Sequence, residues 1–260
     1  MKNLFEISGK VAVVTGGSRG IGAMIARGFV ENGVKTYITS RKLDELNASA
    51  AELSQFGECI AIQADLSSIE GVNAFADAIG ERESSLDILV NNAGASWGED
   101  INTFPEMGWD KVMNINLKAP FFLTQRLLPL LRQSGSDADP ARVINIASIH
   151  AFINPNMNTY SYSASKAGMV QLTRHLAVDL AADKITVNGI APGFFPSKMT
   201  AFLLQDEDTS MAEHNLLGRM GQAEDAAGTA IYMASQAAAW MTGHTLVLDG
   251  GEIAQSGSVG

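Results

Sequence analysis

The sequence has a single cysteine, Cys59, and few basic side chains. Its 260 residues include 18 Lys and Arg against 28 Asp and Glu, a formal net charge of -10. One cysteine excludes a disulfide within the chain and suits a reducing compartment, so we expect a cytoplasmic protein. The acidic balance speaks against nucleic acid or an anionic membrane as a partner. No apolar run approaches the length of a membrane span, and we expect no signal peptide in residues 1–6.

Short apolar runs alternate with longer helical patterns along the chain. The length suits one domain, which we place over residues 1–260. The predicted strands cover residues 11–15, 35–39, 59–64, 88–91, 142–147, 186–191 and 245–248. The predicted helices include residues 21–32, 43–55, 69–79, 109–132, 162–181 and 223–234. This alternation predicts an α/β fold, a doubly wound parallel sheet of about seven strands flanked by helices, with the ligand at the carboxyl ends of the strands.

A glycine-rich turn follows the first predicted strand. The run TGGSRGIG over residues 15–22 lies between that strand and a helical pattern. In this context Gly16 permits a tight turn, Gly20 lets the backbone approach a pyrophosphate, and Gly22 allows close packing of helix on strand. The helix N-terminus would face the phosphates. The run therefore predicts a dinucleotide-binding site whose members also include Ser18, Arg19 and Ile21.

A tyrosine and a lysine four residues apart form a second feature. Tyr162 and Lys166 would lie on the same face of a helix. A nearby ammonium favours the phenolate and so lowers the pKa of the tyrosine toward working pH. With Ser148 upstream, the pair predicts proton transfer to or from an oxygen, as in carbonyl reduction or alcohol oxidation. Tyr160 has Ala164 four residues on, so we expect it to be a packing residue at the helix start.

The motifs of one enzyme family occur here in that family's order. They are the glycine run at residues 15–22, Asp65-Leu66, Asn91-Asn92-Ala93-Gly94, Asn116, Ser148, Tyr162 with Lys166, and Pro192-Gly193. Through these residues, nearly the whole chain resembles the classical short-chain dehydrogenase/reductases. The resemblance implies a single-domain Rossmann enzyme that uses a nicotinamide cofactor.

The same resemblance implies a role for each catalytic residue. Tyr162 would be the acid in reduction and the base in oxidation, while Lys166 lowers its pKa and binds the nicotinamide ribose. Ser148 would donate a hydrogen bond to the carbonyl oxygen, where negative charge builds as hydride arrives. Asn116 would hold a water behind the lysine for proton relay, and the family spacing favours it over Asn114.

The choice of nicotinamide cofactor follows from the end of the second predicted strand. Enzymes that prefer NAD have a carboxylate there, which repels a 2′-phosphate. Alignment with the family puts Ser40 at this position, and the next residue, Arg41, can clasp a phosphate with two nitrogens. Arg19 lies on the same rim. We therefore expect NADP(H).

Further cofactor contacts are implied along the same edge of the sheet. Asp65 resembles the family residue that meets the adenine amino group; otherwise it would cap the following helix, a position for which Ser67 competes. The stretch that brackets the nicotinamide carboxamide is matched by Pro192, Gly193 and Ser197. The other expected contacts are Leu66, Asn92, Ala93 and Gly94, and no metal is expected.

The substrate lid of the family corresponds to about residues 194–218, which begin with many large apolar side chains. Four more apolar side chains are expected near the same mouth: Trp97, Phe152, Ile153 and Met157. An apolar pocket favours an apolar carbonyl or alcohol over a small sugar, although ordinary core or a subunit interface would have the same composition. His150, two residues past Ser148, either touches the substrate or is an incidental loop residue.

Within the family, residues 87–98, 140–146 and 191–200 resemble the bacterial β-ketoacyl reductases associated with rhamnolipid synthesis. This implies NADPH-dependent reduction of a 3-oxoacyl thioester. Reductases that dock the acidic acyl-carrier protein have basic residues near the end of the active-site helix, whereas this chain has Asp179 and Asp183 there, with only Lys184 beyond. A coenzyme-A ester or a free bulky ketone is therefore an alternative.

Two other readings are a dehydrogenase for a sterol, aromatic polyketide or cyclic alcohol, and a non-catalytic cofactor-binding protein. Loss of one of the four catalytic residues would indicate a non-catalytic protein, but Asn116, Ser148, Tyr162 and Lys166 are all present.

The helices predicted at 109–132 and 162–181 carry apolar residues on more than one face. Examples are Met169, Val170, Leu172, Leu176 and Val178. A helix that is apolar on two sides needs a partner beyond its own sheet, and in family members these helices pack against their copies. The strand at 245–248 would be an exposed sheet edge. We therefore expect a homotetramer, or at least a dimer through the helices, rather than burial of both faces in one subunit.

Overall fold

A computed structural model of the chain describes residues 3–154, 156–196 and 215–256. Within them, one sheet has the strand order β3-β2-β1-β4-β5-β6-β7, and every pairing is parallel. The strands are β1 (Val11–Thr15), β2 (Lys35–Ser40), β3 (Cys59–Gln63), β4 (Ile88–Asn91), β5 (Ala141–Ile146), β6 (Ile185–Pro192) and β7 (Thr245–Leu248). The predicted doubly wound sheet is confirmed, and each predicted strand occurs within one residue of its expected ends.

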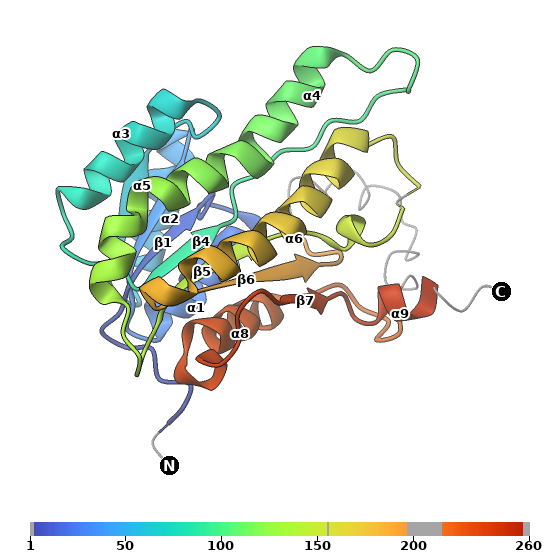
Figure 1. Cartoon of the computed structure of the whole chain (residues 1–260). Helices are drawn as coiled ribbons and strands as arrows, with labels where there is room; N and C mark the ends of the chain where they lie inside the picture. Colours follow the sequence, from blue (N-terminus) through green and yellow to red (C-terminus); the bar gives the residue numbers. More distant parts are fainter. Residues whose placement is uncertain (1–2, 155, 197–214, 257–260) are drawn as a thin grey trace.

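Helices cover both faces of the sheet (Figure 1). One face carries α1 (Gly20–Glu31), α2 (Leu43–Leu53) and α8 (Ala223–Ala234). The other carries α3 (Ile69–Gly80), α5 (Ala119–Ser134) and α6 (Tyr160–Leu180). Shorter segments are α4 (Glu106–Met113), η1 (Asn114–Lys118), η2 (Ile149–Ala151), η3 (Ala181–Asp183), η5 (Gln236–Ala238) and α9 (Glu252–Ser256). None of the described helices is long and apolar enough to cross a membrane.

The first strand shows why the sheet is apolar throughout. Ala12 and Val14 pack into the core beneath α1 and α8, while Val13 packs into the core on the opposite face. Successive side chains of a strand point to opposite faces, so a strand covered on both sides has no polar face. The carboxyl end of this central strand is where the glycine turn begins.

The stretch predicted to be helical over residues 109–132 is helical throughout, but it contains a π-helical segment that was not predicted. The structure has α4, then a π-helical segment, η1, and then α5; Figure 1 shows α4 and α5 forming one long rod. The Ala119 N–H bonds to the carbonyl of Asn114, five residues back. Pro120 has no N–H, so the carbonyl of Asn116 cannot receive the bond that an α-helix would supply from residue 120. The register change turns the Asn116 side chain inward, where it is 1% exposed.

Helix α6 begins at Tyr160, two residues before the predicted start. The Tyr160 ring lies edge-on to Phe104, with centroids 5.8 Å apart, and is 38% exposed. Tyr162, by contrast, points to the carboxyl ends of the strands. The packing role expected for Tyr160 agrees with this arrangement.

Candidate active site

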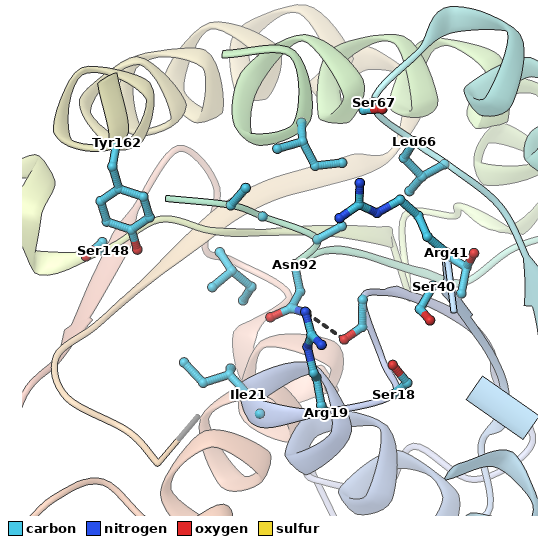
Figure 2. A pocket seen from close by; sticks show the side chains of 18 of the residues that line it. Ser18, Arg19, Ile21, Ser40, Arg41, Leu66, Ser67, Asn92, Ser148 and Tyr162 are labelled. Carbon is cyan, nitrogen blue, oxygen red and sulfur yellow. Dashed lines mark hydrogen bonds between the residues drawn. The ribbon is translucent and has the colours of Figure 1, made fainter. Parts of the chain in front are cut away.

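A cavity of about 300 Å³ opens at the carboxyl ends of the strands. It brings together most of the predicted site residues: Gly16, Ser18, Arg19, Gly20, Ile21, Ser40, Arg41, Asp65, Leu66, Asn92, Ala93, Gly94, Ser148, Tyr162, Lys166, Pro192 and Gly193. Figure 2 shows Ser40, Arg41 and Leu66 at one end of it and Ser148 with Tyr162 at the other. Gly22 and Asn116 lie behind the lining, and Ser197 falls outside the described residues.

The glycine turn is shaped for close approach of a ligand to the backbone. Gly16 and Gly20 have φ angles of 65° and 54°, which a side chain disfavours. A Cβ on Gly22 would collide with the Gly16 carbonyl and with the side chain of Asn92, so Gly22 makes room for the turn itself. The Asn92 amide donates to the Thr15 carbonyl at 2.8 Å and thereby ties the turn to β4.

Helix α1 begins without a capping side chain. Its N-cap residue is Arg19, no side chain accepts a bond there, and the first turn holds no acidic residue. The first N–H groups of the helix therefore lack side-chain acceptors and carry the positive end of the helix dipole. This is the arrangement that binds phosphate.

Charged side chains line the rim beside the turn. Arg19 lies 3.4 Å and Lys42 lies 3.0 Å from the Glu45 carboxylate, and the arginine and lysine side chains are 51% and 66% exposed. Within the described part of the chain, Arg41 makes no salt bridge. Ser40 ends β2, and its hydroxyl bonds only to the main chain of Lys42. Thus the rim offers positive charge at the position where a carboxylate would repel a 2′-phosphate.

Asp65 follows β3 and does not cap a helix. Its carboxylate accepts bonds from the Ser67 N–H at 3.0 Å and the Ser67 hydroxyl at 2.7 Å. Burial raises the pKa of Asp65, but the two Ser67 bonds and the charge of Arg41 outweigh it and hold the pKa below its ordinary value. The cap of α3 is Ser68, which accepts from Gly71, so both suggested caps, Asp65 and Ser67, were wrong.

At the opposite end, β5 and α6 bring three side chains together. The Ser148 hydroxyl accepts a bond from the His150 N–H at 3.2 Å and lies beside the Tyr162 hydroxyl (Figure 2). The Lys166 ammonium donates to the Ile146 carbonyl at 2.7 Å and lies 5.6 Å from the centre of the Tyr162 ring. Ser148 is 6% and Lys166 is 4% exposed, so both polar groups are held in a nearly water-free environment.

Burial controls the pKa values at this end. It raises the pKa of Tyr162 above its ordinary value, against the opposing effect of the Ser148 hydroxyl. It lowers the pKa of Lys166 to about 8. We expected Lys166 to lower the pKa of Tyr162; the structure differs, because desolvation of the phenol dominates and the ammonium contacts the ring and the Ile146 carbonyl.

The Asn116 side chain connects helix α6 to the loop that follows strand β4. Its amide donates to the Ala95 carbonyl at 3.0 Å and to the Ser165 hydroxyl at 2.9 Å, and its carbonyl oxygen accepts from the Ala95 N–H at 2.8 Å. Ser165 lies next to Lys166 on α6. Asn114 instead lines a surface groove between η1 and α6. Asn116, and not Asn114, therefore faces the candidate site, in agreement with the expectation from family spacing.

Ten residues that line the cavity were not predicted as site residues: Thr39, Lys42, Glu45, Ala64, Ser67, Ala95, Lys111, Ile115, Ile146 and Ala147. Lys111 and Ile115 are four residues apart, a spacing that would put them on one face of a helix and could have suggested that they line the site together. Trp97, expected near the mouth of the substrate site, packs on α4, where the cavity-lining Lys111 lies 5.0 Å from its ring centre and Gly108 leaves space for the ring. As far as the described residues show, Phe152, Ile153 and Met157 do not line the cavity either.

Residues 10–208 match the short chain dehydrogenase family, and the chain belongs to that family. A Pseudomonas aeruginosa relative, the rhamnolipids biosynthesis 3-oxoacyl-(acyl-carrier-protein) reductase, is 46% identical over 253 residues, which are 96% of this chain and 99% of the relative. The 2-dehydro-3-deoxy-D-gluconate 5-dehydrogenase of Dickeya dadantii is 35% identical over 97% of this chain and 99% of its own. The solved Pseudomonas aeruginosa RhlG/NADP active-site complex has a TM-score of 0.93 and 45% identity, and covers 97% of this chain and 99% of its own.

Proposed function

We propose that this protein is an NADP(H)-dependent oxidoreductase that reduces a ketone to a secondary alcohol, with a 3-oxoacyl thioester as substrate. The observation that carries the proposal is the meeting of an uncapped helix N-terminus and the Ser148–Tyr162–Lys166 group in one cavity. The rhamnolipid-associated relative supports the substrate class, and the NADP complex supports the cofactor.

In the proposed reaction, bound NADPH supplies a hydride to the carbonyl carbon. Tyr162 gives its phenolic proton to the carbonyl oxygen, which completes the alcohol. Ser148 donates a hydrogen bond to the same oxygen as negative charge develops. The His150 N–H occupies one lone pair of the serine oxygen and so helps to orient the hydroxyl for this bond.

Lys166 and Asn116 support the tyrosine. An ammonium has three donors, and the Ile146 carbonyl uses one, so two are available for a ribose hydroxyl and a water. The Asn116 amide is fully engaged by Ala95 and Ser165, whereas its main-chain carbonyl lacks the usual donor because residue 120 is proline. We propose that the water expected to relay protons to Lys166 donates a hydrogen bond to that carbonyl oxygen.

We propose that the rim formed by Ser40, Arg41 and Arg19 selects NADP(H) over NAD(H). The Arg41 guanidinium is unpaired within the described residues and would bind the 2′-phosphate. Asp65 and Leu66 would contact the adenine. The central part of the cofactor would lie against Gly16, Ser18, Gly20, Ile21, Asn92, Ala93 and Gly94, with Gly22 supporting the turn from behind. The nicotinamide would be contacted by Pro192, Gly193 and Ser197.

Apolar side chains support a bulky substrate. The Phe194 ring lies edge-on to His150, and Phe195 lines the cavity, so the proposed lid at about 194–218 begins beside the site. At the acidic end of α6, Arg132 pairs with Asp183 at 2.8 Å and Lys184 pairs with Asp137 at 2.6 Å. These pairs leave little free positive charge for an acidic carrier protein, so a coenzyme-A ester is the thioester to test first.

We propose a homotetramer, or at least a dimer. A groove between η1, α5 and α6 is lined by apolar side chains including Leu117, Phe121 and Leu172. Val178 is 77% exposed on α6, and Trp240 is fully exposed near the edge strand β7. Light scattering at micromolar concentration should give a multiple of 27.5 kDa, and a mass near that value would contradict assembly. We also propose a cytoplasmic location, which suits the buried, unpaired Cys59.

The proposed function is tested by steady-state oxidation of NADPH against three ketones. We expect the highest kcat/KM with a 3-oxoacyl-coenzyme A, less with a steroid ketone, and least with a sugar-derived keto acid. A preference for the keto acid would instead favour the activity named for the Dickeya dadantii relative. No turnover with any ketone would favour a non-catalytic cofactor-binding protein.

A further inference from the structure

His150 lies beside the reacting end of the site but takes no part in the proton transfer described above. Its ring is edge-on to Tyr162, with centroids 5.9 Å apart, and edge-on to Phe194, with centroids 6.4 Å apart. Its main-chain N–H holds the Ser148 hydroxyl at 3.2 Å. The imidazole therefore lies between the proposed acid and the apolar segment that borders the substrate space.

The two ring nitrogens of His150 have different surroundings. Nδ1 is buried and has no hydrogen-bond partner, whereas Nε2 is not among the enclosed, unpaired atoms. Burial lowers the pKa of His150, so the ring is neutral at neutral pH. A proton on Nδ1 would be a donor stranded without an acceptor, so the proton belongs on Nε2. The ring then presents an N–H donor on its open side.

In the described residues the one hydrogen bond of His150 uses its main-chain N–H, so the Nε2–H can donate to an acceptor on a ligand. The ketone oxygen of a substrate must lie against Ser148 and Tyr162 to receive its proton. In a 3-oxoacyl thioester, one methylene separates the ketone from the thioester carbonyl. The second carbonyl therefore stays next to the Tyr162 ring, where His150 is the neighbouring donor.

We propose that His150 is a substrate-binding residue that selects for β-dicarbonyl substrates: its Nε2–H donates a hydrogen bond to the thioester carbonyl while Ser148 and Tyr162 hold the ketone. This inference rests on the proposed function and names the group that distinguishes a 3-oxoacyl substrate from a simple ketone. His150 moves no proton, so its effect is on binding and orientation alone.

The test compares two substrates and two variants with NADPH. Ethyl 3-oxohexanoate has both carbonyls, whereas trifluoroacetophenone is an activated ketone with no second carbonyl. His150→Phe keeps a flat ring between Tyr162 and Phe194 but removes the donor, and His150→Gln keeps an N–H near the position of Nε2. We expect His150→Phe to lower kcat/KM for the keto ester about tenfold or more, as for loss of one hydrogen bond, and that for trifluoroacetophenone less than about twofold. We expect His150→Gln to recover most of the loss.

Three outcomes would overturn the inference. An equal loss on both substrates would mean that the ring only positions Tyr162 or Ser148. No loss on either would mean that the keto ester does not reach His150. A variant His150→Gln as poor as His150→Phe would mean that the donor is not what matters. If the wild-type protein reduces neither substrate, the proposed function itself fails, which the same experiment shows separately.

Discussion

The two ends of the cavity are built in opposite ways. At the catalytic end, Ser148, Lys166 and Asn116 are 6%, 4% and 1% exposed, and each has a hydrogen-bond partner within the protein. At the other end, Arg19 and Lys42 extend into solvent and share the single carboxylate Glu45. Proton transfer requires groups fixed in a desolvated place, whereas a phosphate can be bound by mobile, hydrated charges. Substitutions should therefore have large effects at the first end and modest ones at the second.

The largest effect should come from Tyr162→Phe. The change removes the transferable proton but keeps the ring that His150 and Lys166 contact. We expect kcat to fall by about a thousandfold or more, with the affinity for NADPH, measured by fluorescence titration, nearly unchanged. Tyr160→Phe is the matched control and should lose less than about twofold. The reverse pattern would place the acid at Tyr160 and contradict the proposed site.

The second-largest effect should be that of Lys166→Met on the free energy of unfolding. The pKa of Lys166 falls from 10.5 to about 8 on burial, so its charged form costs about 3 kcal/mol in the folded protein at neutral pH. The cost is fully present below pH 8. It decreases as the pH rises toward 10.5, because the folded state then releases its proton before the unfolded state does. Lys166→Met should abolish turnover yet raise the free energy of unfolding by about 1–3 kcal/mol at pH 7, after loss of the bond to Ile146.

Urea unfolding without cofactor, at one protein concentration, measures this difference. We expect the advantage of Lys166→Met to shrink between pH 8 and pH 10. If Lys166→Met were less stable than the wild-type protein at pH 7, the hydrogen bond to Ile146 would outweigh the cost of burying the charge. Lys166 would then stabilise the folded protein.

At the phosphate end, Arg41→Ala should lower the preference for NADPH over NADH. Loss of one charge-assisted contact costs about 1.5–3 kcal/mol, which corresponds to a change of roughly ten- to a hundredfold in the ratio of kcat/KM values. Lys42→Ala is the control, since Lys42 lies on the same rim but is paired with Glu45. An unchanged ratio in Arg41→Ala would show that Arg41 does not bind the 2′-phosphate.

The smallest effect should come from Glu45→Gln. The carboxylate lines the cavity and neutralises Arg19 and Lys42, and exposed pairs of this kind contribute about 0–1 kcal/mol. Its removal should lower the KM for NADPH a few-fold, more at low than at high salt, and leave the KM for NADH nearly unchanged. An equal decrease for both cofactors would mean that Glu45 acts on the glycine turn rather than on the 2′-phosphate.

The strands and the glycine turn could be predicted because their signals are local. Val11–Thr15 is a short run of mostly β-branched residues, and after it Gly16 and Gly20 have the positive φ angles that the turn requires. The tetrad candidates could be predicted from spacing and from family resemblance. Family spacing favoured Asn116 over Asn114, and in the structure Asn116 bonds to Ser165 beside the site.

The π-helical segment within the helical stretch over residues 109–132 could not be predicted from periodicity. The apolar pattern of that stretch runs through the π-helical segment, and the missing N–H of Pro120 only suggests a break without saying how the chain accommodates it. The packing of the Trp97 ring against Gly108 and Lys111 of the same helical stretch likewise follows only from the tertiary structure.

By itself, the sequence determined the alternating α/β fold, the order of the motifs and the identity of the groups that can move a proton. Only the tertiary structure decided their electrostatic state. Burial raises the pKa of Tyr162 and lowers that of Lys166, and it encloses Nδ1 of His150 without a partner. Desolvation depends on which segments pack around a group, and for these side chains the segments come from β5, α6 and the loop after β6, which are distant in sequence and meet only in the folded protein.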